Sequence, residues 1–326
     1  MNRLPKAKGK DIHSGSIGTA FFYCIEALSQ AMKVLPSFRH ALLLLIVCCS
    51  HHAAAQWFGN GAVELGSNDN VSRSPVAQQE HSDQSLRAGI SGGYHFQVAD
   101  YTGLTIDASL TREQFRRYSG LSSNRVALGG TLSHKFGLGE RAPIATLGMT
   151  TERAIHNLSL RNSWLYLLQA GVQQRLADKV LLRLSLEQQL QRGDYNRPRP
   201  APAPPMPGDV WKLDLLVASA TVEWDTGPAS WLVAGMQLRH GDTVASVEPS
   251  PRFRVQSSAV TVDPVFGTGI VSYRLNANTR LFSLDWNLAT SDRSTLYIGA
   301  ERQLSRGGTD LTYQAGIIRT GFIVSY

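Results

Sequence analysis

The sequence predicts an all-β chain that closes into a transmembrane, antiparallel up-and-down β-barrel of about 14 strands. Apolar and polar residues alternate in many segments after residue 56, and these segments run for about 10 to 13 residues. Strands of soluble proteins cluster near about 5 or 6 residues, whereas a tilted strand needs about 9 to 11 to cross a bilayer. The connections between the segments alternate between short and long, as expected when one end of a barrel carries tight turns.

The chain begins with the pattern of an export signal. Basic residues precede the apolar run 41–49, and the small residues Ala53 and Ala55 lie just before Gln56. This order is typical of a secretory signal peptide. We therefore expect a signal peptide over 32–55, cut before Gln56.

Residues upstream of Met32 do not fit such a signal. We predict that 1–31 is a spurious N-terminal extension; the alternative is an unusually long positive region before the apolar run. The barrel is then 56–326. All three cysteines lie before residue 56, so this part has no disulfide framework.

Composition excludes several other classes. The longest apolar run has nine residues, far short of the about 20 that a spanning helix needs. An apolar content of 43% argues against disorder. Six of the 32 basic residues and two of the 25 acidic ones precede residue 56, which leaves a charge of +3 with no basic tract. We expect no nucleic-acid partner.

Fourteen segments have the strand pattern. In the second, even-numbered residues from Leu86 to Val98 are apolar or glycine, and odd-numbered ones from Arg87 to Gln97 are polar or glycine. If 252–275 is one long loop, the count falls to twelve; either even count places both termini at the periplasmic end. The predicted strands are 57–66, 85–98, 103–116, 124–136, 143–155, 163–176, 180–191, 211–224, 230–240, 252–262, 268–275, 280–290, 294–304 and 312–326.

Two connecting segments add to this picture. Trp224 and Trp231 bracket the short turn 225–229, where amphipathic rings would lie at a membrane interface. The proline-rich segment 192–210 is predicted to be a stiff projection. It either folds over the barrel mouth as a gate or is a solvated loop.

The last strand carries a resemblance to a known class. Ile318, Phe322, Val324 and Tyr326 occupy alternate positions, and the sequence ends on the aromatic residue. This pattern resembles the closing strand of bacterial outer-membrane β-barrel proteins. The resemblance implies a location in the Gram-negative outer membrane. It also implies that Phe322, Val324 and Tyr326 form an insertion signal read by the barrel-assembly machinery.

The polar positions of the strands are the candidate pore-lining residues. Both signs of charge occur there, which fits a water-filled channel with a local transverse field. The alternative is a barrel whose inward charges pair across strands and plug it. The candidates are Arg87, Arg125, Arg183, Arg319, Asp107, Glu113, Glu187, Asp285 and Glu301.

A passive channel, or porin, for hydrophilic solutes or an exported polysaccharide is the predicted function. The alternative is a non-conducting structural, surface or translocation barrel of an export system. The segment 59–75 is similar to the first strand of barrels encoded with exopolysaccharide export systems, which implies polysaccharide-export partners.

Lipid is the other expected partner. Arginine makes bidentate contacts with phosphate, so Arg116, Arg117, Arg302 and Arg306 are candidates to bind lipopolysaccharide at the outer rim. A GC-rich genome would produce the same excess of arginine over lysine.

Catalysis is not expected. The histidines after residue 56 are spread over separate strands and loops, and none stands in a nucleophile or metal-ligand motif. We therefore predict no enzyme activity, no cofactor and no metal site.

Overall fold

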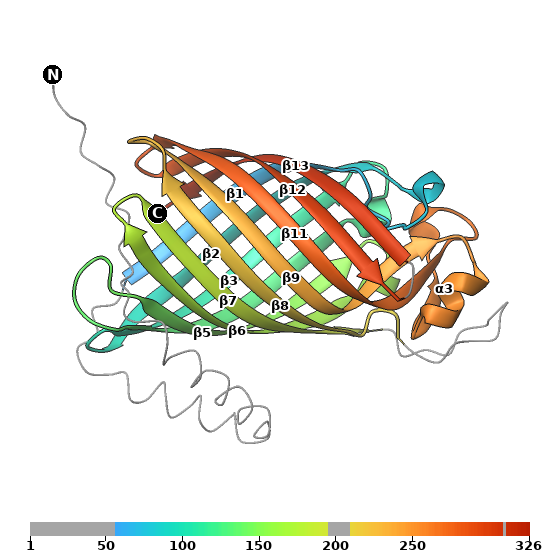
Figure 1. Cartoon of the computed structure of the whole chain (residues 1–326), viewed down its shortest axis with the longest axis horizontal. Helices are drawn as coiled ribbons and strands as arrows, with labels where there is room; N and C mark the ends of the chain where they lie inside the picture. The colour runs from blue at the N-terminus through green and yellow to red at the C-terminus, as the bar shows by residue number, and fades with distance from the viewer. Residues whose placement is uncertain (1–55, 195–208, 309–310) are drawn as a thin grey trace.

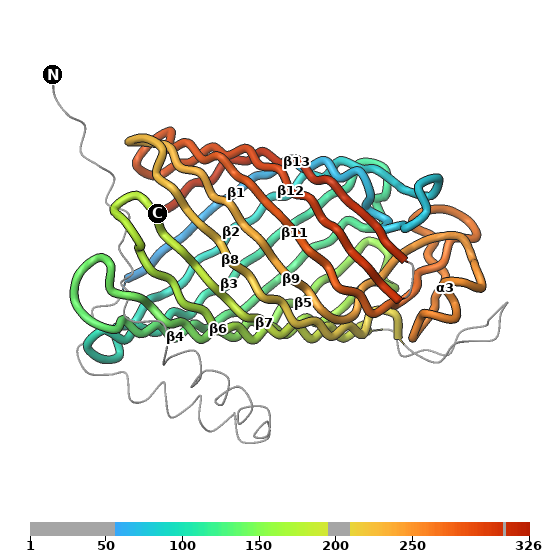
Figure 2. Tube along the Cα trace, in the orientation of Figure 1, coloured from blue at the N-terminus to red at the C-terminus, as the bar shows by residue number. Residues whose placement is uncertain are grey.

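A closed, tilted β-barrel is the architecture of the chain (Figures 1 and 2). The computed structural model describes residues 56–194, 209–308 and 311–326. The strands are β1 (Gln56–Asn68), β2 (Asp83–Ala99), β3 (Thr102–Phe115), β4 (Ser123–Lys135), β5 (Ile144–His156), β6 (Ser163–Ala177), β7 (Val180–Gly193), β8 (Leu213–Asp225), β9 (Ser230–Val247), β10 (Ala259–Val262), β11 (Val271–Ser291), β12 (Ser294–Gly307) and β13 (Leu311–Ser325).

Short helices occur only in connections of the described chain. They are η2 (Ala77–Gln79), η3 (Ser119–Leu121), η4 (Ser159–Arg161), α3 (Pro251–Gln256) and η5 (Pro264–Phe266). Among the described residues, no helix is long and apolar enough to cross a membrane.

Twelve antiparallel strands complete the ring. β1 pairs with β13, and β9 pairs with β11, so every edge of these twelve strands is hydrogen-bonded to a neighbour. β10 adds to β11 beyond the end of the β11–β12 ladder and lies outside the ring. Closure matters because a strand edge facing hydrocarbon would leave backbone groups without partners.

The chain takes the twelve-strand alternative. The separate strands predicted at 268–275 and 280–290 are one continuous strand, β11. The predicted strand 252–262 is instead the helix α3 followed by the four-residue β10. Pro251 lies in the first turn of α3, where its missing N–H costs no helix hydrogen bond.

Both ends of the barrel chain lie on one side. The start of β1 and the end of β13 are at the end opposite α3 (Figure 1), together with the two-residue connections 100–101, 178–179 and 292–293. The opposite end carries the long connections 69–82 and 248–270, together with the described ends of the connection between β7 and β8. In outer-membrane barrels the short turns face the periplasm and the long loops face outward.

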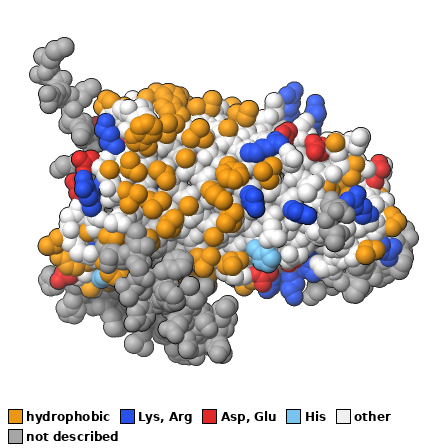
Figure 3. Space-filling model, in the orientation of Figure 1, with side chains coloured by type: hydrophobic (Ala, Val, Ile, Leu, Met, Phe, Trp, Pro, Cys, Tyr) orange, Lys and Arg blue, Asp and Glu red, His pale blue; other side chains and the backbone are white. Residues whose placement is uncertain are grey.

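The outer wall carries an exposed apolar belt. Ile90, Leu128 and Ile318 are 65%, 57% and 63% exposed, and similar side chains spread over the visible face (Figure 3). Near the termini, the Tyr94 ring lies edge-on to Trp57 and Phe96 at centroid distances of 4.6 and 4.5 Å. An apolar surface of this extent, edged by aromatic rings, suits contact with lipid.

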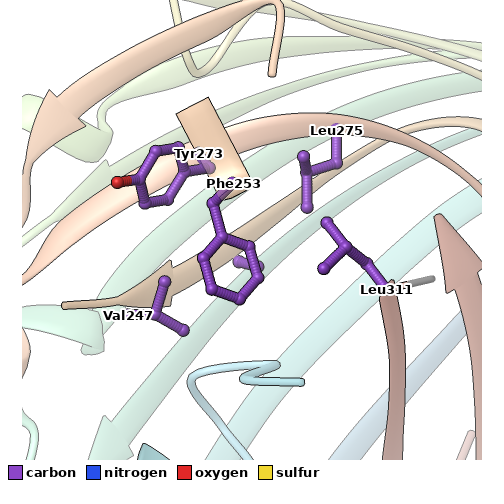
Figure 4. Close-up of a cluster of buried hydrophobic side chains, with 6 residues drawn as sticks. Val247, Phe253, Tyr273, Leu275 and Leu311 are labelled. Atoms are coloured by element: carbon purple, nitrogen blue, oxygen red, sulfur yellow. The ribbon is translucent and has the colours of Figure 1, made fainter. Parts of the chain in front are cut away.

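The apolar core lies at the loop end instead of inside the wall. One cluster joins Val247, Phe253, Tyr273, Leu275 and Leu311 (Figure 4), together with Ala245. A second cluster joins Val210, Trp211, Val244 and Ala259. Buried side chains therefore hold the loops to the strand ends.

Candidate functional site

Alternating charges form a ladder on the inner face of five neighbouring strands. Strand register puts Arg87 opposite both Glu64 and Glu113. Arg87 lies 3.5 Å from Glu64 and 3.0 Å from Glu113, and Arg125 lies 3.6 Å from Glu113 and 3.5 Å from Glu152. These five residues of β1–β5, the charge ladder, alternate in sign around the wall.

Two further contacts reach across an intervening strand. Arg319 of β13 donates two hydrogen bonds to Asp285 Oδ1 of β11, at 3.0 and 2.9 Å, and a third to Oδ2. Gly299 of β12 is registered between them, and a Cβ there would overlap the Asp285 carboxylate. Similarly, Tyr297 donates to Glu64 at 2.5 Å over Gly321 of β13. Glycine on the middle strand provides the space for both contacts.

The remaining candidates occupy separate parts of the same face. Arg183 pairs with Glu223 at 2.8 Å. Asp107 lies against Gly129, and Glu187 accepts a hydrogen bond from Gln189. Glu301 is registered opposite Ser283 on the inner face of β12.

The inner face also holds partners that the sequence analysis did not name. They are Glu64, Glu152, Glu223 and Tyr297. Glu64 stands between Val63 and Leu65, so strict alternation would have assigned it to the interior. Alternation therefore indicates that Glu64 faces inward, but its pairing with Arg87 depends on the register between β1 and β2.

Inward arginines stay accessible despite their ion pairs. The side chains of Arg87 and Arg183 keep 48% and 43% of their accessible surface although they point away from the outer wall. The interior therefore has room for water beside these guanidinium groups. Because opposite charges are neighbours on one wall, the field that they produce is confined to short distances.

The mouth at the loop end is crossed by a lid, which we define as residues 69–82, 116–122, 157–162, 209–212 and 248–270. Its centre is an ion pair, 2.5 Å long, between Arg161 and Asp263. Two strands, β7 and β8, separate the connections from which these residues come. This pair therefore joins connections that are a third of the way round the twelve-stranded ring from one another.

Polar and aromatic groups surround the Arg161–Asp263 pair. Asp263 is 1% exposed and accepts hydrogen bonds of 2.7 Å from the hydroxyls of Ser246 and Ser272. The Arg161 guanidinium lies 4.5 Å from the centre of the Trp211 ring. Burial lowers the pKa of Arg161, and the adjacent Asp263 carboxylate opposes that shift.

Residues 69–82 of the lid contact the end of β9 and two other segments of the lid. The backbone N–H of Ser246 donates to the Ser72 carbonyl at 2.9 Å. The His81 ring stacks on Phe266 at 5.2 Å, and the Tyr118 hydroxyl lies 2.9 Å from His81 Nδ1. Burial lowers the pKa of His81, which favours its neutral form beside these rings.

The structure describes only some of the residues of the predicted terminal signals. Phe322 and Val324 lie on the outer face of β13, opposite Val63 and Gly61 of β1, and Tyr326 is 78% exposed. Gln56 is the first residue of β1. The proposed extension 1–31, the signal peptide 32–55 with Ala53 and Ala55, and most of the proline-rich segment lie outside the described residues.

The histidines of the described residues do not converge on one site. His95 and His134 each contact a threonine hydroxyl, at 3.0 and 2.8 Å, while His240 contacts Asn278 and His156 contacts the Leu121 carbonyl. Within the described chain, no three His, Cys, Asp or Glu side chains form a group that could hold a metal ion.

Comparison with known proteins identifies the fold. No protein family matches the sequence, and no curated protein does. An outer membrane channel from Pseudomonas putida F1 has a similar structure, with a TM-score of 0.55 and 14% identity, covering 83% of this chain and 95% of that one. The chain has the fold of bacterial outer-membrane β-barrel proteins.

More distant solved structures match with lower scores. The NanC porin has a TM-score of 0.44 and 10% identity, and covers 81% of this chain and 98% of its own. The channel DcaP of Acinetobacter baumannii has a TM-score of 0.41 and 8% identity, with 85% and 98% covered.

Proposed function

We propose that the protein is a passive channel for small hydrophilic solutes in the bacterial outer membrane. The observation that carries this proposal is the accessible surface kept by Arg87 and Arg183 on the inner face of a closed twelve-stranded ring. Accessible charges inside an apolar outer wall give polar solutes a hydrated route with partners for hydrogen bonding. The lid would admit a bulky polysaccharide only by moving, so small solutes fit the interior better.

The proposed orientation follows from the two ends of the barrel. The lid would face outward, and the termini would face the periplasm. Export would use the signal peptide 32–55, so the mature protein is expected to begin at Gln56. N-terminal sequencing of protein taken from outer membranes checks this, and residues from before Met32 in that material would contradict it.

A second candidate is a non-conducting barrel of an export system, structural or surface-exposed. The observation that favours it is the lid itself, because its loops are joined by a buried ion pair and by apolar clusters. Partners from a polysaccharide-export system are expected only if this second function is correct.

Conductance separates the two candidates. The full chain is expressed, purified from outer membranes in detergent, shown to be folded by heat-modifiable migration, and added to a planar lipid bilayer. The channel proposal expects discrete current steps. Folded protein that inserts into the bilayer and gives no current steps, with or without voltage, would contradict the channel proposal and favour the non-conducting barrel.

A further inference from the structure

Three arginines cluster on the outer face near the loop end. Arg280 of β11 is registered directly opposite Leu304 of β12, and Arg302 and Arg306 lie two residues to either side of Leu304 on the same face. All three are exposed. Diagonal neighbours on one face of a sheet are within reach of long side chains. We call Arg280, Arg302 and Arg306 the arginine patch.

The arginine patch lies where the apolar belt ends. Toward the termini, β11 and β12 present exposed Phe282, Leu284, Trp286, Leu296 and Ile298. Arg280 itself is flanked across the ladders by Leu238 and Leu304, which are 47% and 38% exposed. In Figure 3, Lys and Arg side chains lie just beyond the apolar surface, toward the α3 end. Arginine stems there can pack on apolar groups while the guanidinium groups reach the lipid headgroups.

Most donors of the patch are not used within the described chain. Arg302 contacts Gln314 and lies 4.0 Å from Asp69, while no described carboxylate lies within ion-pair distance of Arg280 or Arg306. Outward arginines elsewhere on this rim differ. Arg153 pairs with Asp194, and Arg112 donates to Asn124 at 3.2 Å.

The other arginines considered at this rim are less suited to an anion. Arg116 donates to Gln84 at 3.1 Å, and the backbone N–H of Arg117 donates to Asp83 at 3.0 Å. Both line a hollow of about 140 Å³ that also contains the Asp83 carboxylate. Negative charge already occupies that position, whereas the arginine patch has none in contact except Asp69.

We propose that the arginine patch binds the phosphate groups of the phosphorylated glycolipid, lipopolysaccharide, in the outer leaflet. A guanidinium group donates two parallel hydrogen bonds to a phosphate, and such charge-assisted bonds are the strong ones. The acyl chains of the same lipid would lie along Phe282, Leu284 and Ile298 below. The inference rests on the proposed location in the outer membrane and does not depend on conduction.

The first experiment measures lipid that copurifies with the barrel. Wild-type protein and the triple variant R280Q/R302Q/R306Q are purified from outer membranes, and lipopolysaccharide per barrel is quantified by mass spectrometry. We expect the triple variant to retain about tenfold less, because three charged phosphate donors are removed. The matched control R112Q/R153Q/R192Q removes the same charge from outward-facing positions of β3, β5 and β7, and should retain the wild-type amount.

Heat-modifiable migration shows whether each variant is folded. If the triple variant does not fold, R280K/R302K/R306K keeps the charge but loses the bidentate geometry, and should retain an intermediate amount of lipid. Equal lipopolysaccharide on wild type and on a folded triple variant would overturn the proposal, as would equal loss from the matched control.

A second experiment identifies the source of the phosphate. The purified wild-type barrel is delipidated and incubated with phosphorylated lipid A, with dephosphorylated lipid A, or with inorganic phosphate, and its thermal unfolding is followed. Stabilisation by phosphorylated lipid A alone is expected, and it should be lost in the triple variant. Equal stabilisation by inorganic phosphate, or by the dephosphorylated lipid, contradicts a lipid phosphate site. Because no current is measured, a barrel that fails to conduct can still pass this test.

Discussion

At the scale of single residues, two contacts on the inner wall depend on glycines, which have no side chain to block them. Gly299 and Gly321 each lie between two longer side chains that meet above them, Asp285 with Arg319 and Tyr297 with Glu64. Neither glycine has a backbone conformation that other residues avoid. Their role is therefore to leave space, which lets an interaction span two strand spacings.

Replacing Gly299 by alanine should break the Asp285–Arg319 pair. The added Cβ would overlap the carboxylate, and the loss of charged hydrogen bonds should lower the free energy of unfolding by about 1–3 kcal/mol. Urea unfolding in lipid vesicles measures this value. Gly130 is the matched control, because a Cβ there has no neighbour within 4 Å. Equal stability of G299A and G130A would show that the space is not needed.

The Asp263 carboxylate forms the buried ion pair that joins two loops of the lid. Asp263→Asn keeps the shape but leaves the Arg161 guanidinium buried without its partner charge, which costs about 3–5 kcal/mol. We expect a looser lid, seen as a larger single-channel conductance and faster proteolysis within 248–270. Asp178→Asn is the control, because its pair with Arg141 is exposed at the other end and contributes little. Unchanged conductance and proteolysis in D263N would show that the Arg161–Asp263 ion pair does not hold the lid in place.

At the scale of elements, β13 joins the two ends of the sheet. It pairs with β12 on one side and β1 on the other, its outer face carries Phe322 and Val324, and Tyr326 follows its last residue. If these residues are the insertion signal, Tyr326→Ser should lower the folded fraction in the outer membrane several-fold. Heat-modifiable migration of membrane fractions measures that fraction. Ser325→Ala, which changes the inward neighbour, should assemble normally; equal assembly of Y326S would contradict the signal.

Sequence alternation predicted the strands well where the outer face meets lipid. It failed at β11, where the polar residues Asn276 and Asn278 interrupt the apolar series and a break was predicted. In the structure these two face outward above the belt, while Ala277 and Thr279 are buried inward. Beyond the lipid, an outward residue no longer has to be apolar, so the period-two signal fades while the strand continues.

The lid was not predictable from local pattern. Arg161 and Asp263 are 102 residues apart in sequence, and each lies in a connection with no periodicity. The candidate inner residues were found because alternation fixes their face, but the pairing of Arg87 with Glu64, or of Arg319 with Asp285, requires the register of separate strands.

At the scale of the whole molecule, the interior combines paired charges with an excess of carboxylates over arginines. The charge ladder places each arginine between two carboxylates, so no wall is uniformly positive or negative. A channel of this kind should favour small cations over small anions, but only weakly because most charges are paired.

Ion selectivity tests this arrangement. In a potassium chloride gradient at low salt, the wild-type reversal potential should lie slightly on the cation-selective side of zero. Arg87→Glu places a third negative charge beside Glu64 and Glu113 and should shift the potential further toward cation selectivity. Arg112→Glu makes the same charge change on the outer face and should have little effect. An equal shift in both variants would mean that the ladder does not line the conducting path.

The pairing of β1 with β13 also constrains how the barrel can form. Asn60 and Ser325 are partners in this ladder, so the ring cannot close until almost the whole chain has been synthesised. Contacts between such distant segments carry a large loop-closure cost and make folding slow. Until then β1 presents a free edge that can pair with other chains. Assembly of this protein therefore depends on protecting its first strand until its last one arrives.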